Sequence, residues 1–207
     1  MNLNDLSKNI YVLNLKKRLD RKKHIVSQLN KINCNEYNLI ESVDGSTLIN
    51  PTRLKNGMFG LIKTYINIYE DLSKKNYEDV LIVEDDCIFC EDFNTLLEKY
   101  ISNVPNDWDF LYFGANHNYH MGNVTQKINE EVIKLNNSYS AHCVLFKKKV
   151  FDDLILNIMN FSIENDVMMA NLQKKYNAYS SSVTLTTQLS NFSNIENKLS
   201  DYSWLIK

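Results

Sequence analysis

The feature that most constrains the fold is a continuous apolar run at residues 80–83 that leads directly into Glu84, Asp85 and Asp86. A short unbroken run of Val, Leu and Ile is typical of a central strand that is covered on both faces of a sheet. Neighbouring carboxylates repel one another, so three of them at the end of such a strand favour a bound cation or several hydrogen-bond donors. We therefore expect a layered fold with a polar site at the carboxyl end of this strand.

The segments around this run predict an α/β fold. A β-branched and aromatic run at residues 10–15 is followed by a charged helical pattern, and a second extended run at residues 37–43 ends in an Asp-Gly turn. This order predicts a βαβ unit and a Rossmann-like, mostly parallel central sheet flanked by helices. Other patterns predict helices over residues 19–29, 58–72, 93–101, 150–158 and 167–172, and strands over residues 109–113 and 144–146.

The length and charge of the chain limit the classes of protein to which it can belong. No linker or internal repeat divides the 207 residues, so one domain over residues 1–207 is expected. The net charge is −2 and the basic residues form no single stripe, which argues against nucleic acid as a ligand. No stretch approaches the ~20 apolar residues of a membrane span, and residues 1–9 are too polar for a secretion signal. We expect a cytoplasmic protein, and the bias toward Asn, Lys and Ile fits a virus-encoded one.

The acidic run itself predicts a metal-assisted phosphate site, although an exposed turn is the alternative. A hard divalent ion binds carboxylate and phosphate oxygens together, and it neutralises the charge of a departing diphosphate. The chain contains only five glycines and no Gly-rich phosphate loop. Phosphate would then be held through the metal and a few basic side chains.

Several segments, taken in order, resemble glycosyltransferase family 25. They are Val12-Leu13-Asn14-Leu15 with Arg18 and Asp20-Arg21, then Val43-Asp44-Gly45, Gly60 and residues 81–86, with residues 108–114 and 140–144 beyond them. That family includes bacterial lipooligosaccharide galactosyltransferases and collagen hydroxylysine galactosyltransferases. The resemblance covers most of the chain, and it implies a GT-A fold and a UDP-sugar donor that carries galactose or glucose. It also implies Mn²⁺ or Mg²⁺ at the acidic motif and inversion at the anomeric carbon.

The resemblance assigns roles to individual residues of the donor and metal sites. It implies that Asp86 contacts the metal directly, with Glu84 at the other outer position of an Asp-x-Asp-like motif. From its residue type alone, His142 is a candidate for a further metal ligand, with a structural role as the alternative. Gln188, near a glutamine of the family, is a candidate for an acceptor or pocket contact. The residues expected to bind the donor are Asn14, Leu15, Arg18, Asp44, Glu84 and Asp85, with Asp44 near the uridine.

The sequence departs from the family pattern at the start of one predicted helix. Gly60 is followed by Leu61, and Thr64 and Tyr65 stand where the family usually has Ser-His. Tyr65 is then either a substitute polar group in the donor or acceptor pocket, or a core aromatic on the apolar stripe of the helix.

Inverting transfer requires a second acidic site, because a carboxylate must accept the proton of the acceptor hydroxyl. Glu164 and Asp166 precede a predicted helix, where the resemblance implies an acidic residue. We expect Asp166, rather than Glu164, to be the catalytic base. Capping of the helix by Asn165 or Asp166 is the alternative, and the two roles are compatible.

The predicted function is metal-dependent, inverting transfer of a hexose from a UDP-sugar to a hydroxyl of a glycan or protein. One alternative is a weak or inactive homologue that binds a nucleotide sugar or carbohydrate, which the departures at Leu61 and Tyr65 favour. The other is a metal-dependent nucleotidyl or phosphoryl transferase, since carboxylates and a divalent ion also serve that chemistry. The polar residues 116–137 lack periodicity, which predicts either a loop that closes over the substrates, with Tyr119 as a candidate for stacking on a sugar, or a disordered segment.

Overall fold

The fold is organised around one eight-stranded sheet. The computed structural model describes residues 1–117, 125–193 and 198–201. The helices there are α1 (Leu3–Leu6), α2 (Leu19–Lys31), the 3₁₀ helix η1 (Gly45–Thr47), α3 (Asn56–Leu72), α4 (Phe93–Asn103), α5 (Lys148–Ile158) and α6 (Asn165–Leu172). The strands are β1 (Ile10–Leu15), β2 (Asn38–Ser42), β3 (Asp79–Glu84), β4 (Cys87–Phe89), β5 (Phe110–Tyr112), β6 (Gln126–Lys127), β7 (Val132–Lys134), β8 (Cys143–Lys147), β9 (Ala178–Ser181), β10 (Thr186–Gln188), β11 (Asn191–Ser193) and β12 (Lys198–Ser200).

The strand order of the sheet is β2-β1-β3-β8-β5-β9-β7-β6. Six of these eight strands run in one direction. The two reversed strands are β8, between β3 and β5, and β7, between β9 and β6. The predicted α/β fold with a central sheet flanked by helices is confirmed. The sheet was predicted to be mostly parallel, and this is correct for the direction of the strands. Four of the seven strand pairings are nevertheless antiparallel, because each reversed strand lies between two others.

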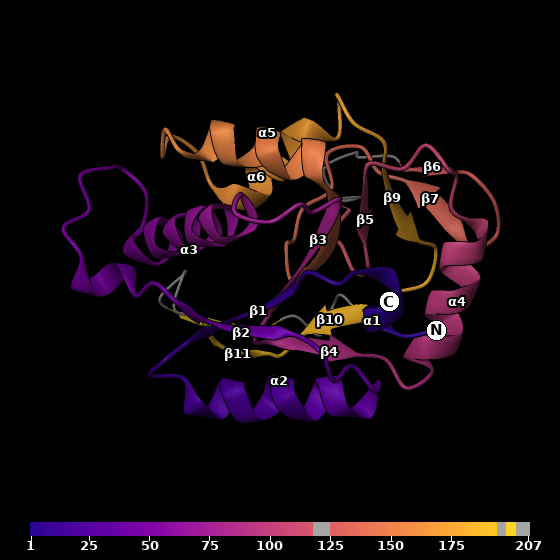
Figure 1. Cartoon of the computed structure of the whole chain (residues 1–207), viewed down its shortest axis with the longest axis horizontal. Helices are drawn as coiled ribbons and strands as arrows, with labels where there is room; N and C mark the ends of the chain where they lie inside the picture. The colour runs from indigo at the N-terminus through magenta and orange to yellow at the C-terminus, as the bar shows by residue number, and fades with distance from the viewer. Residues whose placement is uncertain (118–124, 194–197, 202–207) are drawn as a thin grey trace.

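The central strand β3 is covered on both faces, as its apolar run predicts. Val80 and Ile82 face a core formed with α3, α5 and α6, whereas Leu81 and Val83 face a core formed with α2 and α4. This alternation follows from the two-residue period of a strand. All four side chains are fully buried, and burial of each contributes roughly 1.5–3 kcal/mol. Figure 1 shows α3, α5 and α6 above the sheet and α2 below it.

Every predicted helix and strand is present, but several short elements escape the sequence patterns. The short helix α1 and the strands β4, β6, β7 and β9 to β12 are additional. The polar residues 116–137, expected as a closing loop or a disordered segment, include β6 and β7, because β7 pairs with β9 at the side of the sheet. Tyr119 lies outside the described residues. Among those that are described, no helix is both long and apolar enough to cross a bilayer.

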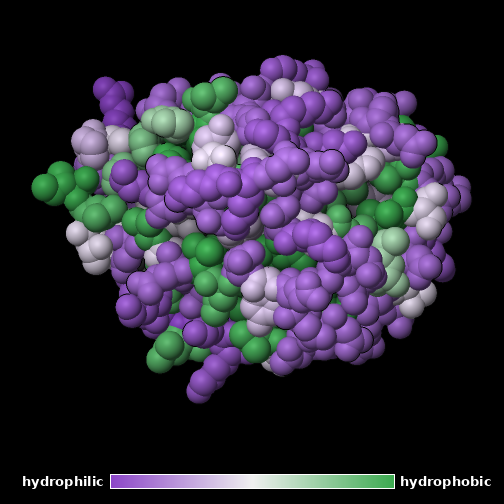
Figure 2. All heavy atoms as spheres, in the orientation of Figure 1, coloured by the Kyte–Doolittle hydropathy of each residue, from purple (hydrophilic) through white to green (hydrophobic). Residues whose placement is uncertain are grey.

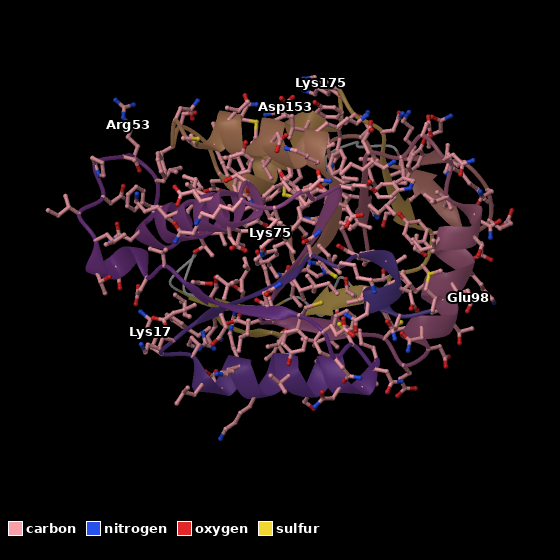
Figure 3. All side chains as sticks on the ribbon, viewed as in Figure 1. Lys17, Arg53, Lys75, Glu98, Asp153 and Lys175 are labelled. Carbon is pink, nitrogen blue, oxygen red and sulfur yellow. The ribbon has the colours of Figure 1, made fainter. Side chains whose placement is uncertain are left out.

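The charged side chains are distributed over the surface of the fold. Figure 2 shows a mainly hydrophilic face on which apolar side chains form small separate groups. Figure 3 shows Asp153 and Lys175 next to each other at the outer side of α5, where they form an ion pair. Exposed pairs of this kind are each worth at most about 1 kcal/mol, so burial in the two cores dominates the stability of the fold.

Two glycines let η1 pack directly on the backbone of α3. A Cβ atom on Gly60 would lie 2.4 Å from the carbonyl oxygen of Val43 and 2.6 Å from the backbone nitrogen of Gly45. A Cβ atom on Gly45 would lie 1.8 Å from the carbonyl oxygen of Asn56. Because these neighbours are backbone atoms, only glycine fits at either position without moving η1.

We expect Gly60→Ala to lower the free energy of unfolding by about 1–3 kcal/mol, because the added methyl forces α3 and η1 apart. Chemical denaturation of the full chain measures this change. Asn67→Ala, at an exposed position of the same helix, is the matched control and should change stability by less than about 0.5 kcal/mol. Equal stability of the Gly60 variant and the wild type would contradict the close approach.

Candidate functional site

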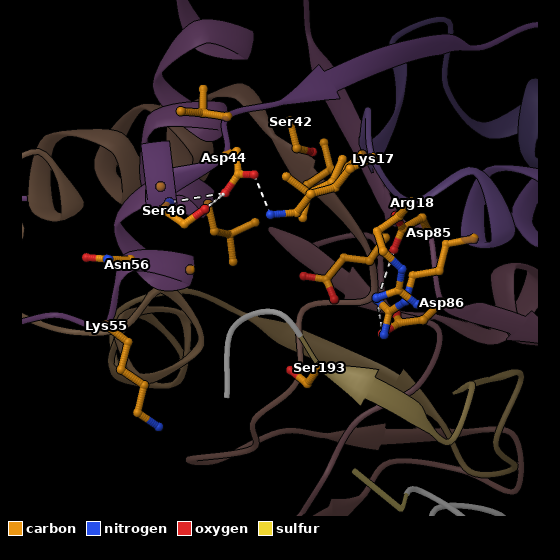
Figure 4. Close-up of a pocket in the computed structure, with 18 of the residues that line it drawn as sticks. Lys17, Arg18, Ser42, Asp44, Ser46, Lys55, Asn56, Asp85, Asp86 and Ser193 are labelled. Atoms are coloured by element: carbon orange, nitrogen blue, oxygen red, sulfur yellow. Dashed lines mark hydrogen bonds and ion pairs between the residues drawn. The ribbon is translucent and has the colours of Figure 1, made fainter. Parts of the chain in front are cut away.

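A pocket of about 700 Å³ opens at the carboxyl ends of β1, β2 and β3, where open α/β sheets bind ligands. Its volume lies within the range of about 300–1,000 Å³ that is usual for small-molecule sites. Figure 4 shows two groups of polar side chains in it. One contains Lys17, Asp44 and Ser46, and the other contains Arg18, Asp85 and Asp86.

The acidic motif is held by a buried arginine. Arg21, in the first turns of α2, donates from Nη1 to Asp85 Oδ1 and to Asp86 Oδ2, each at 3.0 Å. Asn14, near the end of β1, donates from Nδ2 to Asp85 Oδ2 at 2.7 Å. Both oxygens of Asp85 therefore accept a hydrogen bond within the protein, and its carboxylate is fixed in place.

Asp86 retains an oxygen that the described residues do not satisfy. Its Oδ1 atom is buried and has no hydrogen-bond partner among them, whereas its Oδ2 atom accepts the bond from Arg21. A buried carboxylate oxygen without a partner is costly, and a cation compensates it well. Of the two aspartates, Asp86 is thus the one whose geometry suits direct contact with a metal ion.

The charges of the site perturb one another strongly. Burial, followed by the charges of Asp86 and Asp85, raises the pKa of Glu84 to about 8. Burial also raises the pKa of Asp85, although the positive charge of Arg21 opposes that shift. For Arg21, burial alone would lower the pKa, but the nearby charges of Asp86 and Asp85 raise it overall. One guanidinium thus compensates a group of three carboxyls.

Two arginines converge on a single backbone oxygen beside the acidic motif. Arg18 Nη1 and Arg21 Nη2 both donate to the carbonyl oxygen of Phe192 in β11, at 3.0 and 3.1 Å. Ser193 of the same strand lines the pocket. Two guanidinium groups directed at one oxygen form an arrangement suited to phosphate oxygens.

The opposite end of the pocket is polar but less charged. Asp44 forms an ion pair with Lys17 and accepts hydrogen bonds from the backbone nitrogen and the hydroxyl of Ser46, at 3.1 and 2.6 Å. The bond from Lys17, followed by the bond from Ser46, lowers the pKa of Asp44. Lys55 and Asn56, at the start of α3, complete this end.

Tyr65 and Asp166 lie near Glu84 but do not line the pocket. Tyr65 is fully buried against Phe151, with ring centroids 6.2 Å apart, so it occupies the core position that was the alternative for this residue. Burial, followed by the charge of Glu84, raises the pKa of the Tyr65 hydroxyl, and the charge of Asp166 adds to this. The three side chains thus form one electrostatically coupled group, which we call the Glu84–Asp166 group.

The start of α6, the helix that carries Asp166, does not match the predicted alternative in which Asn165 or Asp166 caps the helix. The N-cap residue of α6 is Glu164, whose side chain makes no cap hydrogen bond, and Asn165 is the first helical residue. Asp166 lies in the first turn, where its Oδ1 atom accepts a hydrogen bond of 2.9 Å from the backbone nitrogen of Val167. Neither Asn165 nor Asp166 is the N-cap residue, although a carboxylate in the first turn is favoured by the helix dipole.

The structure brings part of the predicted donor site together. The predicted residues that line the pocket are Leu15, Arg18, Asp44, Glu84, Asp85, Asp86 and Gln188. Gln188 lines the same pocket as the acidic motif, because β10 pairs with β4 directly after that motif. The predicted residues outside the lining are Asn14, Tyr65, His142, Glu164 and Asp166.

The sequence did not single out two charged side chains that line the pocket. Lys17 and Arg21 both belong to the basic stretch before and within α2, and both line the pocket. The signals for Arg21 were its place in an Asp-Arg pair within the resemblance to family 25 and its place in the densest basic run, at residues 16–23. For Lys17 we find no signal that separates it from the neighbouring lysines of the same stretch.

His142 is fully buried at the base of β8, away from the pocket lining. Its Nε2 atom lies 3.2 Å from the carbonyl oxygen and 3.0 Å from the hydroxyl of Thr186. In the part of the chain that the structure describes, no group of three His, Cys, Asp or Glu side chains has the geometry of a metal site. A three-ligand set with Glu84, Asp86 and His142 is therefore not preformed.

We expect the burial of His142 to make the stability of the protein depend on pH. Burial lowers the pKa of His142 from 6.5 to about 4, so the unfolded chain binds a proton more readily than the folded one. The free energy of unfolding should therefore fall as the pH decreases from 6.5 to about 4, by up to about 3 kcal/mol from this group. Urea denaturation at several pH values, with His142→Gln for comparison, measures it. A variant with the same pH slope as the wild type would contradict this assignment.

Comparison with known proteins identifies relatives of the chain. A family model described as glycosyltransferase family 25 (LPS biosynthesis protein) matches residues 7–187. Procollagen galactosyltransferase 2 of Homo sapiens is 26% identical over 128 residues, which cover 51% of this chain and 20% of that protein. Procollagen galactosyltransferase 1-A of Xenopus laevis is 26% identical over 128 residues, covering 51% of this chain and 21% of that protein. The chain thus spans about a fifth of the length of these curated relatives.

A solved structure provides a further comparison at the level of the fold. A glycosyltransferase involved in the glycosylation of the major capsid of PBCV-1 has a TM-score of 0.41 and 10% sequence identity to this chain. The similarity covers 73% of this chain and 66% of that one.

Proposed function

The chain belongs to glycosyltransferase family 25, and from this premise we propose that it transfers a hexose from a UDP-sugar to a hydroxyl group with the help of a divalent ion. One observation carries the proposal. Asp86 presents a buried oxygen without a partner among the described residues, and two arginines that line the same pocket donate to one backbone oxygen, that of Phe192. Carboxylate and guanidinium groups in this arrangement suit a metal-bound diphosphate.

The residues of the site fit a Mn²⁺ or Mg²⁺ ion of the kind that binds together with a phosphate substrate. Such ions often take only one or two protein carboxylates and complete their coordination with phosphate oxygens and water. Asp86 would supply one carboxylate oxygen, and Glu84, which also lines the pocket, would supply a second carboxyl. When bound, the ion would stabilise the negative charge that develops on the departing diphosphate.

The remaining side chains would bind and orient the donor. Arg18 and Arg21 would hold the diphosphate by charge-assisted hydrogen bonds, at the position where they now donate to a carbonyl oxygen. Asn14 keeps Asp85 in place and so maintains the shape of the acidic motif. Asp44 and Ser46 lie at the other end of the pocket, which would receive the nucleoside.

The acceptor would approach from the side of the Glu84–Asp166 group. In an inverting displacement, the acceptor oxygen attacks the anomeric carbon opposite the diphosphate, and its proton passes to a carboxylate within hydrogen-bond reach. We assign this proton to Asp166, because it is the acidic residue of α6 that is electrostatically coupled to the end of β3.

The names of the relatives suggest a donor and an acceptor to test first. They are galactosyltransferases of procollagen, so galactose is the first sugar to test and a protein hydroxyl is the first acceptor. Glucose and a glycan hydroxyl are the next choices, since the family resemblance includes both. The chain matches only about a fifth of those relatives, so these choices are proposals for this chain.

Calorimetric titration of the full chain with UDP, UDP-galactose and UDP-glucose, with and without Mn²⁺, tests the proposal. We expect binding of at least one UDP-sugar that strengthens when Mn²⁺ is present, together with slow release of free sugar. Binding without hydrolysis or transfer to any acceptor would instead indicate a nucleotide-sugar-binding homologue. Consumption of ATP with no response to UDP-sugars would indicate a nucleotidyl or phosphoryl transferase. No binding of any UDP species would contradict the proposal.

A further inference from the structure

Arg21 occupies the position at the acidic motif where a metal ion would be expected to provide the positive charge. Its Nη1 atom lies 3.0 Å from an oxygen of Asp85 and 3.0 Å from an oxygen of Asp86, so one nitrogen bridges both carboxylates. The residue is 9% exposed. A buried positive charge this close to two carboxylates opposes the approach of a second cation to either of them.

The guanidinium group of Arg21 is not fully satisfied in this position. Its Nε atom is buried and has no hydrogen-bond partner among the described residues, and Asp86 Oδ1 is likewise buried without one. Within the described part of the chain, its Nη2 atom donates to the neutral carbonyl oxygen of Phe192, at 3.1 Å. Hydrogen bonds to anionic oxygens are roughly twice as strong as those to neutral ones. Both the guanidinium and Asp86 therefore gain stronger partners when a diphosphate and a divalent ion enter together.

The long side chain allows this exchange without movement of the helix. Arg21 belongs to α2, whose neighbouring side chains Ile25 and Leu29 are anchored in the core. Arg18 already directs Nη1 at the same carbonyl oxygen, so a phosphate at this point would contact both arginines. A rotation of the Arg21 side chain toward the phosphate would release Asp86.

We propose that Arg21 is an internal competitor of the metal ion, so that a divalent cation binds Asp86 only when a nucleoside diphosphate has drawn the guanidinium away from the acidic motif. This inference rests on the proposed function, because it concerns the same pocket. By linkage, the diphosphate must strengthen metal binding by the same factor by which the metal strengthens binding of the diphosphate. Typical coupling between two such sites is about 5–150-fold.

The test is a titration of the full chain with Mn²⁺, with and without UDP, followed by electron paramagnetic resonance of the free ion. In the wild type, we expect UDP to raise the affinity for Mn²⁺ at least tenfold. In Arg21→Gln, the affinity without UDP should rise about tenfold, and the enhancement by UDP should be severalfold smaller than in the wild type but still present, because phosphate oxygens also coordinate the ion. Lys22→Gln removes a neighbouring exposed charge from the same helix and should behave as the wild type.

A second variant keeps the test decisive if Arg21→Gln does not fold, which thermal unfolding would reveal. In Arg21→Lys the charge is retained, but a single ammonium lacks the rigid fork that reaches two carboxylates and Phe192 together. We expect its affinity for Mn²⁺ without UDP to rise at least threefold. An unchanged or lower affinity in the folded Arg21 variants would overturn the inference.

The failure of this inference differs from the failure of the proposed function. If UDP binds every form and Mn²⁺ binds none, donor binding stands and the inference is wrong. If Arg21→Gln alone binds Mn²⁺ and no form binds UDP, the competition is supported and the proposed function is wrong. If no form binds either ligand, both are wrong.

Discussion

Asp86→Ala is expected to lower the rate of UDP-galactose hydrolysis or transfer by at least about 10³-fold and to abolish the effect of Mn²⁺ on UDP binding. The reason is that Asp86 provides the oxygen left without a partner among the described residues. The fold should persist, because Arg21 keeps its hydrogen bond to Asp85 and is not left as an isolated buried charge. Calorimetry with UDP and Mn²⁺, combined with a turnover assay, measures both effects.

The matched control is Asp92→Ala, which removes an exposed carboxylate six positions further along the chain. Its side chain makes no cap hydrogen bond at the start of α4, so neither binding nor turnover should change by more than about twofold. If Asp86→Ala kept a metal-dependent response of normal size, the metal site would have to be assigned to other residues.

Asp166→Asn is expected to lower turnover by about 10²–10⁴-fold while it leaves the affinity for UDP and Mn²⁺ within threefold of the wild type. An amide cannot accept the proton of the attacking hydroxyl, but it retains the shape and the hydrogen bond to the backbone nitrogen of Val167. A loss confined to turnover separates a base from a residue that shapes the donor pocket.

Glu164→Gln tests the competing assignment of the base. Glu164 is the N-cap residue of α6 and its side chain makes no cap hydrogen bond, so the substitution should have little effect on stability. If Glu164→Gln lowered turnover and Asp166→Asn did not, the roles of the two residues would be reversed. Normal turnover in both variants would remove α6 from the catalytic machinery.

The elements of the fold were predictable where the local sequence pattern is strong. Residues 10–14 and 80–83 are runs of buried residues, and the alternation of their apolar side chains between two cores requires covered faces on both sides. Strands such as β4 and β10 were not predictable in this way. They are three residues long, and their partners lie far apart in the sequence, as Phe89 pairs with Thr186. The antiparallel direction of β8 is also set by distant pairing, since its own residues are compatible with either direction.

Only the part of the candidate site whose residues are contiguous in the sequence was predictable. Glu84, Asp85 and Asp86 follow one another along the chain, so their position at a strand end is visible in the sequence. The side chains that hold them come from far away: Asn14 is 71 positions from Asp85, and Arg21 is 64 positions from it. Arg21 in particular lies in a charged helix whose other basic residues are exposed or half-buried, and only folding distinguishes it from them.

The reversed strand β8 divides the described sheet into two parts. On one side, β1, β2 and β3 end at the pocket, and on the other, β5 and β9 lie in the half of the chain that carries Asp166. The two parts pair only through β8 within the described sheet. For protein engineering, this arrangement has a limit: the segment after β8 carries Asp166 but also Gln188 and Ser193 of the pocket lining, so exchanging it with that of a relative should alter both sides of the site together.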